Sequence, residues 1–199
     1  MYTLYYLPDA CSLATLTVLL ELDQQVTLIN KTGINNFREI NPVGSVPVLV
    51  DGEKTLVEGA AILLQLLQQK PNQLFPQDED AQQQATQNIM FANATMHPAY
   101  GRLFFIAQNL PEGDARNAAF SAAAGAINQL WQFVETQLQD KNFLGGDLVS
   151  AADIMLTVYS RWGEHFPVEI ETGPRTVAML TSVLGRPTFQ RALTMEAEG

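Results

Sequence analysis

The residue with the clearest chemical potential is Cys11, the single cysteine of this 199-residue chain. It follows a short strand-like run and a Pro-Asp-Ala turn, and a helical pattern begins directly after it. Amides at a helix N-terminus favour negative charge, so a thiol there can have a lowered pKa and react as a thiolate. A buried, unreactive cysteine explains the position equally well, because free cysteines are commonly buried.

A lone cysteine limits the redox chemistry of the chain. Ser12, Leu13 and Ala14 follow Cys11, so the sequence has no Cys-x-x-Cys dithiol and can form no internal disulfide. Dithiol exchange within one chain is therefore excluded, whereas exchange with an external thiol stays open. Lack of an internal disulfide also fits a reducing compartment.

Two further pairs of residues could bind a peptide-like ligand. Val46-Pro47 lies in a strand-like run, where proline indicates a strand start, an edge or a cis bond. A cis-proline turn would leave the backbone groups of Val46 free to pair with a ligand backbone. Glu58-Gly59 opens a predicted helix, whose amides can hold a carboxylate while Glu58 accepts from an ammonium group. A favourable acid at a helix start would also explain Glu58.

His97 lies in a long helical stretch, where it could line a cleft between the two halves of the chain. The candidates for an apolar substrate wall are Tyr100, Phe104, Phe105 and Trp162. Packing in the core is an alternative explanation for each of them. The two histidines and one cysteine lack metal-ligand spacing, so we expect no metal site.

The elements that must position these residues change in kind along the chain. Over residues 1–76, strand patterns at 3–6, 26–29, 46–50 and 55–57 alternate with helical patterns at 12–21 and 59–69. Asp51-Gly52 predicts a tight hairpin, and residues 30–41 predict a loop with at most one helical turn. This order predicts a small mixed sheet with helices on it, a thioredoxin-like domain.

Residues 77–199 predict an all-helical domain after a linker at 70–80. Helical patterns cover 81–109, 115–139, 176–184 and 188–196, and Pro98 should bend the first of them. Ser150 and Asp153 form a Ser-x-x-Asp start of a further helix. The predicted fold class is therefore α/β plus all-α.

Composition narrows the choice of partners and compartment. The net charge of −10 argues against nucleic acid or an anionic membrane as a main partner. No run reaches the ~20 apolar residues of a membrane span, and the first residues do not resemble a signal peptide. We therefore expect a cytoplasmic protein.

Several motifs, in the right order along the whole chain, together resemble the bacterial beta-class glutathione transferases. They are Leu4-Tyr5-Tyr6-x-Pro8-x-Ala10-Cys11-Ser12-Leu13, Ile40-Asn41-Pro42-x-Gly44-x-Val46-Pro47-Val48-Leu49, Glu58-Gly59-x-Ala61-Ile62, His97-x-x-Tyr100, Ser150-x-Ala152-Asp153 and Trp162-x-x-His165. The resemblance implies the two-domain transferase fold, usually homodimeric, with glutathione as co-substrate bound in the first domain. It also implies that the Ser150–Asp153 motif is critical for folding.

The resemblance further implies a set of site residues and an activity. The glutathione-binding candidates are Ala10, Cys11, Lys31, Val46, Pro47, Glu58, Gly59 and His97, with Cys11 as the catalytic candidate beside the glutathione sulfur. The expected reaction is conjugation of glutathione to small apolar electrophiles, with thiol-disulfide or peroxidase side activity. A glutathione-dependent disulfide reductase using Cys11, or a non-catalytic interaction protein with the same fold, is the alternative.

Overall fold

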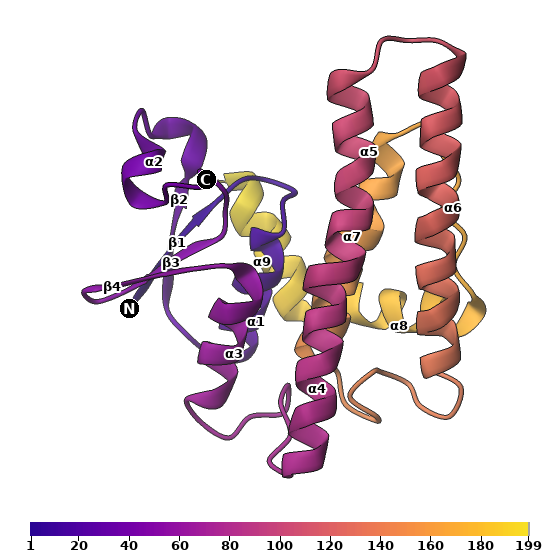
Figure 1. Ribbon diagram of the computed structural model, residues 1–199. Coiled ribbons are helices and arrows are strands. Elements are labelled where there is room, and N and C mark those ends of the chain that lie inside the picture. The colour runs from indigo at the N-terminus through magenta and orange to yellow at the C-terminus, as the bar shows by residue number, and fades with distance from the viewer. Residues whose placement is uncertain (199) are drawn as a thin grey trace.

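The computed structural model describes residues 1–198, so the last residue of the expected 77–199 domain lies outside it (Figure 1). The first part of the chain forms one four-stranded sheet in the order β2-β1-β3-β4. β1 pairs parallel with β2 and antiparallel with β3, which pairs antiparallel with β4. The elements are β1 (Tyr2–Tyr6), α1 (Ser12–Glu21), β2 (Val26–Asn30), α2 (Phe37–Ile40), β3 (Val48–Asp51), β4 (Lys54–Val57) and α3 (Gly59–Gln68). The predicted thioredoxin-like arrangement is confirmed.

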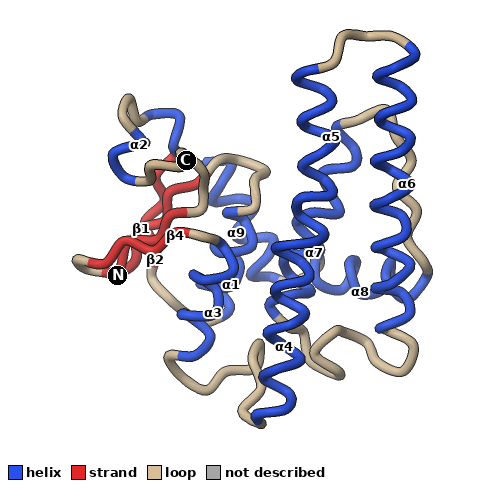
Figure 2. The backbone as a smooth tube through the Cα atoms, viewed as in Figure 1, coloured by secondary structure: helices blue, strands red, loops and turns tan. Residues whose placement is uncertain are grey.

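The rest of the described chain is helical, as Figure 2 shows by the absence of strands beyond β4 up to residue 198. The helices are α4 (Glu79–Phe91), α5 (His97–Asn109), α6 (Asp114–Gln137), α7 (Ala151–Ser160), α8 (Pro174–Leu184) and α9 (Pro187–Glu198), with a 3₁₀ turn, η3, at Arg161–His165. The predicted class, a mixed sheet followed by helices, is therefore correct.

The helix predicted over 81–109 is interrupted just before Pro98. A π-helical turn, η2 (Ala92–Met96), interrupts the long helix, and α5 begins at His97 with Pro98 in its first turn. Proline has no backbone N–H to donate, and this loss is tolerated in the first turn of a helix. The irregular turn therefore comes before the proline.

Helix α1 is the element that joins the two parts. All of its residues except Glu21 are buried, because it lies against the sheet, α3, α7 and α9. A helix that is apolar on all sides is typical of such a central position. Figure 1 shows the C-terminal helix α9 returning to lie beside α1. Cys11 directly precedes α1, so both parts of the chain surround it.

The start of α7 carries the predicted capping box. The Ser150 hydroxyl accepts a hydrogen bond from the Asp153 N–H, and Asp153 accepts from the Ser150 N–H at 2.8 Å. The other Asp153 carboxylate oxygen accepts from the Leu144 N–H at 2.9 Å. Asp153 is fully buried, so one side chain fixes both the helix start and the loop before it.

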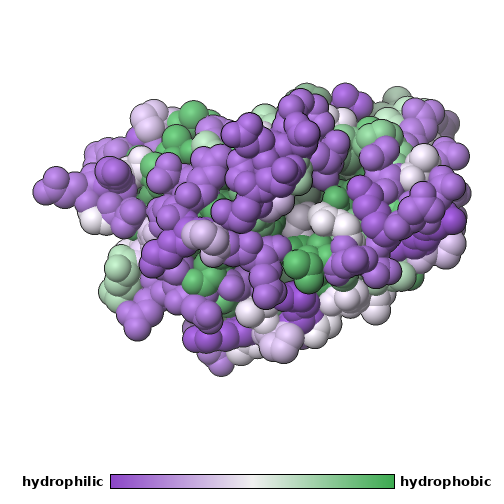
Figure 3. All heavy atoms as spheres, turned by 90° about the horizontal axis from the view of Figure 1, so that it is seen from below, coloured by the Kyte–Doolittle hydropathy of each residue, from purple (hydrophilic) through white to green (hydrophobic). Residues whose placement is uncertain are grey.

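One face of the molecule is mainly polar. Figure 3 shows a face covered by hydrophilic residues with separate small apolar patches. Among residues 1–198 there is no helix long and apolar enough to cross a membrane.

Candidate functional site

Cys11 lies at the N-cap of α1 and is partly buried. Its thiol donates to the carbonyl oxygen of Val46, with 3.3 Å between Sγ and O. Burial raises the pKa of the Cys11 thiol to about 11, although the amides of Cys11 and Ser12 act in the opposite direction. The nearby acids Glu196 and Glu58 raise it further. Of the two explanations that the sequence left open for Cys11, this pKa favours the buried cysteine, because the desolvation of the thiol outweighs the amides at the helix start.

The Val46-Pro47 pair lies directly beside Cys11. The bond between Val46 and Pro47 is cis, one of the three alternatives that the sequence left open. Val46 precedes β3, whose first paired residue is Val48, so the Val46 carbonyl lies outside the ladder and faces the thiol. A Cβ atom built on Gly59 would lie 3.7 Å from the Pro47 ring. The three sequence-predicted sites are thus neighbours in the structure.

Glu58 has an unusual backbone conformation, with φ of 68° at the N-cap of α3. Left-handed backbone is uncommon for a non-glycine residue and costs about 1–3 kcal/mol. The side chain is exposed and makes no capping hydrogen bond to α3 within the described chain. Helix capping therefore does not explain this residue, and its carboxylate is free to meet a ligand.

His97 packs edge-on against Tyr159 and Trp162, with ring centroids 5.1 and 5.2 Å apart. Burial lowers the pKa of His97 below its usual value, which favours the neutral form of the ring. Asn93, in the π-helical turn before it, points its side-chain oxygen toward Gly59. This part of the helical region therefore adjoins the Pro47–Gly59 surface.

The aromatic candidates separate into three environments. Phe104 packs edge-on against Trp162 and against Phe166, which sequence reasoning missed. Tyr100 is fully buried behind them, and its hydroxyl accepts from the Trp131 indole at 2.8 Å. Phe105 lies on the surface with 62% of its area exposed. A substrate wall at these residues stays a prediction, with Phe104 and Trp162 in the best position to form one.

Lys31 contacts the loop that leads to Val46. Its ammonium group donates to the Gly44 carbonyl and lies 5.2 Å from the centroid of the Phe37 ring. A hollow of about 540 Å³ is lined by Lys31, Phe37, Arg38 and Gly44, among others. Two cations at one hollow suit a ligand carboxylate. In the part of the chain that the structure describes, no group of His, Cys, Asp or Glu could hold a metal ion.

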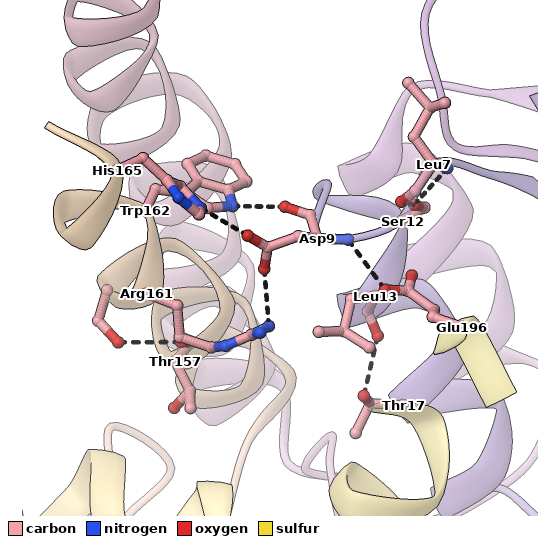
Figure 4. Close-up of polar contacts among 11 residues, drawn as sticks. Leu7, Asp9, Ser12, Leu13, Thr17, Thr157, Arg161, Trp162, His165 and Glu196 are labelled. Atoms are coloured by element: carbon pink, nitrogen blue, oxygen red, sulfur yellow. Dashed lines mark hydrogen bonds and ion pairs between the residues drawn. The ribbon is translucent and has the colours of Figure 1, made fainter. Parts of the chain in front are cut away.

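Sequence reasoning also missed Asp9 and Glu196, which lie beside the turn before Cys11 (Figure 4). Asp9 contacts Arg161, Trp162 and His165 of η3. The Trp162-x-x-His165 pattern was the one available signal for this cluster, and it does not point to Asp9.

One sequence comparison matches a family model to the first part of the chain, and another finds relatives over its full length. The family model for the glutathione S-transferase N-terminal domain matches residues 15–74. Glutathione S-transferase GST-4.5 of Xanthomonas campestris is 31% identical, covering 98% of this chain and 98% of that protein. Glutathione S-transferase GstA of Escherichia coli O157:H7 is 26% identical, covering 97% and 98%.

Solved structures similar to this chain come from the same family as these relatives. A glutathione-S-transferase from Xylella fastidiosa superposes with a TM-score of 0.90 at 26% identity over 99% of both chains. A beta-class glutathione S-transferase from Sphingomonas chungbukensis gives 0.83 at 29% identity over 98% of both. A sphingomonad glutathione S-transferase complexed with glutathione gives 0.84 at 26% identity, covering 99% of this chain and 100% of that one.

Proposed function

The chain belongs to the glutathione transferase family, and we propose that it binds glutathione across Cys11, Val46-Pro47 and Glu58-Gly59 and conjugates it to small apolar electrophiles. The observation that carries this proposal is that the three sites lie in contact with one another. Cys11 meets the Val46 carbonyl, and Pro47 meets Gly59. A relative with glutathione bound supports the choice of co-substrate.

Each part of glutathione has a chemically suitable partner in this arrangement. Val46 pairs with the cysteinyl backbone, Glu58 accepts from the γ-glutamyl ammonium group, and the Gly59 amide faces the neighbouring carboxylate. Lys31 supplies a cation for the remaining carboxylate, and Ala10 and His97 flank the thiol end. These pairings place the glutathione sulfur beside Cys11.

The conjugation step needs a thiolate on glutathione. Amides at the start of α1 stabilise that charge, and the neutral Cys11 thiol donates a hydrogen bond to it as it does to Val46 in the free protein. The glutathione thiol loses its proton to solvent. Its sulfur then forms a bond to the electrophilic carbon, and the leaving group departs with its electron pair. Phe104 and Trp162, with Phe166 beside them, provide apolar contacts for the electrophile.

The raised pKa of Cys11 weighs against the disulfide reductase alternative. With a pKa of about 11, only about 1 in 10,000 molecules carries a thiolate at pH 7. Attack on a mixed disulfide requires that thiolate. Conjugation is therefore the favoured activity, and thiol-disulfide or peroxidase turnover is a minor one. The alternative of a non-catalytic protein is disfavoured by retention of all three sites together.

We extend the proposal to the domains, assembly and compartment. Residues 1–76 act as the glutathione-binding domain and residues 77–199 as the substrate domain, with the boundary between the end of α3 and the start of α4. The protein works as a homodimer, as the resemblance implies, and in the cytoplasm, as the composition and the first residues of the sequence predict.

Replacement of Cys11 by alanine should lower conjugation by no more than about fivefold, the effect of one weak hydrogen bond worth about 1 kcal/mol. Glutathione binding should persist, and any turnover of a mixed disulfide should disappear. Steady-state assays with a chloronitrobenzene and with a glutathione mixed disulfide measure the two activities. Complete loss of conjugation in a variant that still binds glutathione would instead make Cys11 the essential group.

The proposal as a whole is tested with the wild-type protein. We expect retention on immobilised glutathione, elution by free glutathione and turnover of the chloronitrobenzene. A folded protein that shows neither retention nor turnover in either assay would refute both enzymatic functions and leave the interaction protein.

A further inference from the structure

The turn before Cys11 is held on one side by η3. Asp9, two residues before Cys11, has a left-handed backbone with φ of 58°. Its carboxylate lies 3.0 Å from the Arg161 guanidinium and 2.6 Å from His165 Nε2, and its carbonyl accepts from the Trp162 indole at 2.8 Å. Figure 4 shows these side chains converging on Asp9. The helical region therefore fixes a conformation that is unfavourable for an isolated aspartate.

Glu196 of α9 holds the same turn from the other side. One of its carboxylate oxygens accepts from the Asp9 N–H at 3.1 Å, and its carbonyl accepts from the Tyr6 hydroxyl at 3.4 Å. The side chain is 6% exposed, and its second oxygen is buried without a hydrogen-bond partner among the described residues. Burial raises the pKa of Glu196 to about 7. Cys11 titrates at higher pH, so Glu196 is ionised throughout the range in which the thiol loses its proton.

Glu196 makes no ion pair among the described residues, because Arg161 and His165 both contact Asp9 instead. The groups that act on it are Asp9 in the turn and Arg161 in η3, and its own charge acts on Cys11 at the start of α1. Arg161 is already paired with Asp9. The Glu196 carboxylate, bonded to the amide two residues before Cys11, therefore has no cation of its own, and nearby negative charges repel each other strongly where water is excluded.

We propose that Glu196 is a positioning residue for Cys11, which holds the Asp9 turn through its amide and opposes formation of a thiolate with its own charge. Glu196 lies in the C-terminal helix, 187 residues after Asp9 in the sequence. Through this contact the helix keeps Cys11 a neutral hydrogen-bond donor. This inference rests on the proposed function in one respect, which is that Cys11 lies beside the glutathione sulfur.

The two parts of this role can be separated by two substitutions. Glu196→Gln removes the charge and keeps an acceptor for the Asp9 amide, whereas Glu196→Met removes both at similar size. Glu198→Gln makes the same change of net charge at an exposed position of the same helix and serves as the matched control. Because Cys11 is the only cysteine, the pH dependence of the rate of alkylation by iodoacetamide reports the ionisation of this thiol alone.

In both Glu196 variants the thiolate should appear at lower pH, with alkylation at pH 8 faster by about tenfold, equivalent to a thiol pKa lower by about one unit. Hydrogen exchange of the Asp9 amide should accelerate in Glu196→Met and stay near wild type in Glu196→Gln. Circular dichroism identifies any Glu196 variant that has unfolded, and the remaining folded variant then serves as the test.

A thiolate titration identical to that of Glu198→Gln would overturn the electrostatic role. Unchanged Asp9 exchange in a folded Glu196→Met would overturn the holding role. Neither measurement uses glutathione, so the result is independent of the proposed function.

Discussion

Asp153→Ala is expected to lower the free energy of unfolding by about 4 kcal/mol, because it leaves buried hydrogen-bond donors without partners. The carboxylate accepts from the Leu144 N–H, the Ser150 N–H and the Ser150 hydroxyl. Each buried donor left unsatisfied costs about 1–3 kcal/mol, and loss of a helix cap costs about 1 kcal/mol. Water reaching the site offsets part of this sum. Urea unfolding followed by circular dichroism measures the change.

Asp114→Ala provides the matched control for Asp153. Asp114 also lies in the first turn of a helix, α6, but it is exposed. Its removal should change the free energy of unfolding by less than about 0.5 kcal/mol. Ser150→Ala should fall between the two, at about 1 kcal/mol, because the Asp153 carboxylate still binds the loop amides. Equal stability of the Asp153 and Asp114 variants would refute the structural role of the buried carboxylate.

The effect of Asp153 should extend to the site. Helix α7 packs against α1, and α1 begins directly after Cys11. A frayed start of α7 therefore loosens a neighbour of the thiol. Alkylation of Cys11 by iodoacetamide should accelerate in Asp153→Ala at temperatures where circular dichroism still shows a folded protein.

Local patterns made much of this fold predictable. The predicted helix at 12–21 matches α1, and the hairpin predicted at Asp51-Gly52 is present, with Asp51 ending β3 and Gly52, at φ of 60°, opening the turn to β4. The Ser150–Asp153 box is present as expected. Each of these depends on a few consecutive residues, whose side-chain periodicity and turn preferences the sequence displays directly.

The electrostatics of the site depended on contacts that the sequence does not display. For Cys11 the sequence left a reactive thiolate and a buried thiol equally open, because it does not show how far distant helices bury the residue, and burial decides the direction of its pKa. Glu196 meets Asp9 across 187 residues, and no spacing rule connects them. The left-handed backbone of Glu58 was also invisible, because its residue type does not favour that conformation. These unpredicted features all lie around the proposed ligand, where local preferences are overruled.

Glu58→Gln is expected to raise the KM for glutathione by about 10- to 100-fold with little change in kcat. A hydrogen bond between charged groups contributes about 1.5–3 kcal/mol, and each 1.4 kcal/mol is a factor of ten in affinity. In the proposed pose the γ-glutamyl end lies away from the thiol, so the contact is equal in the ground and transition states. Steady-state kinetics and calorimetric titration with glutathione measure both values. Glu53→Gln, at the exposed β3–β4 turn, controls for the loss of one acid.

Glu58→Gly separates a binding role from a structural one. Glycine adopts φ of 68° without the penalty that a Cβ atom imposes, so this variant should be more stable than wild type by about 1 kcal/mol. It should nevertheless bind glutathione as weakly as Glu58→Gln, since the carboxylate is gone. A residue kept for the stability of α3 would give the reverse result, with lower stability and unchanged affinity. Higher stability together with weaker binding means that the strain at Glu58 is retained because the carboxylate must face the ligand.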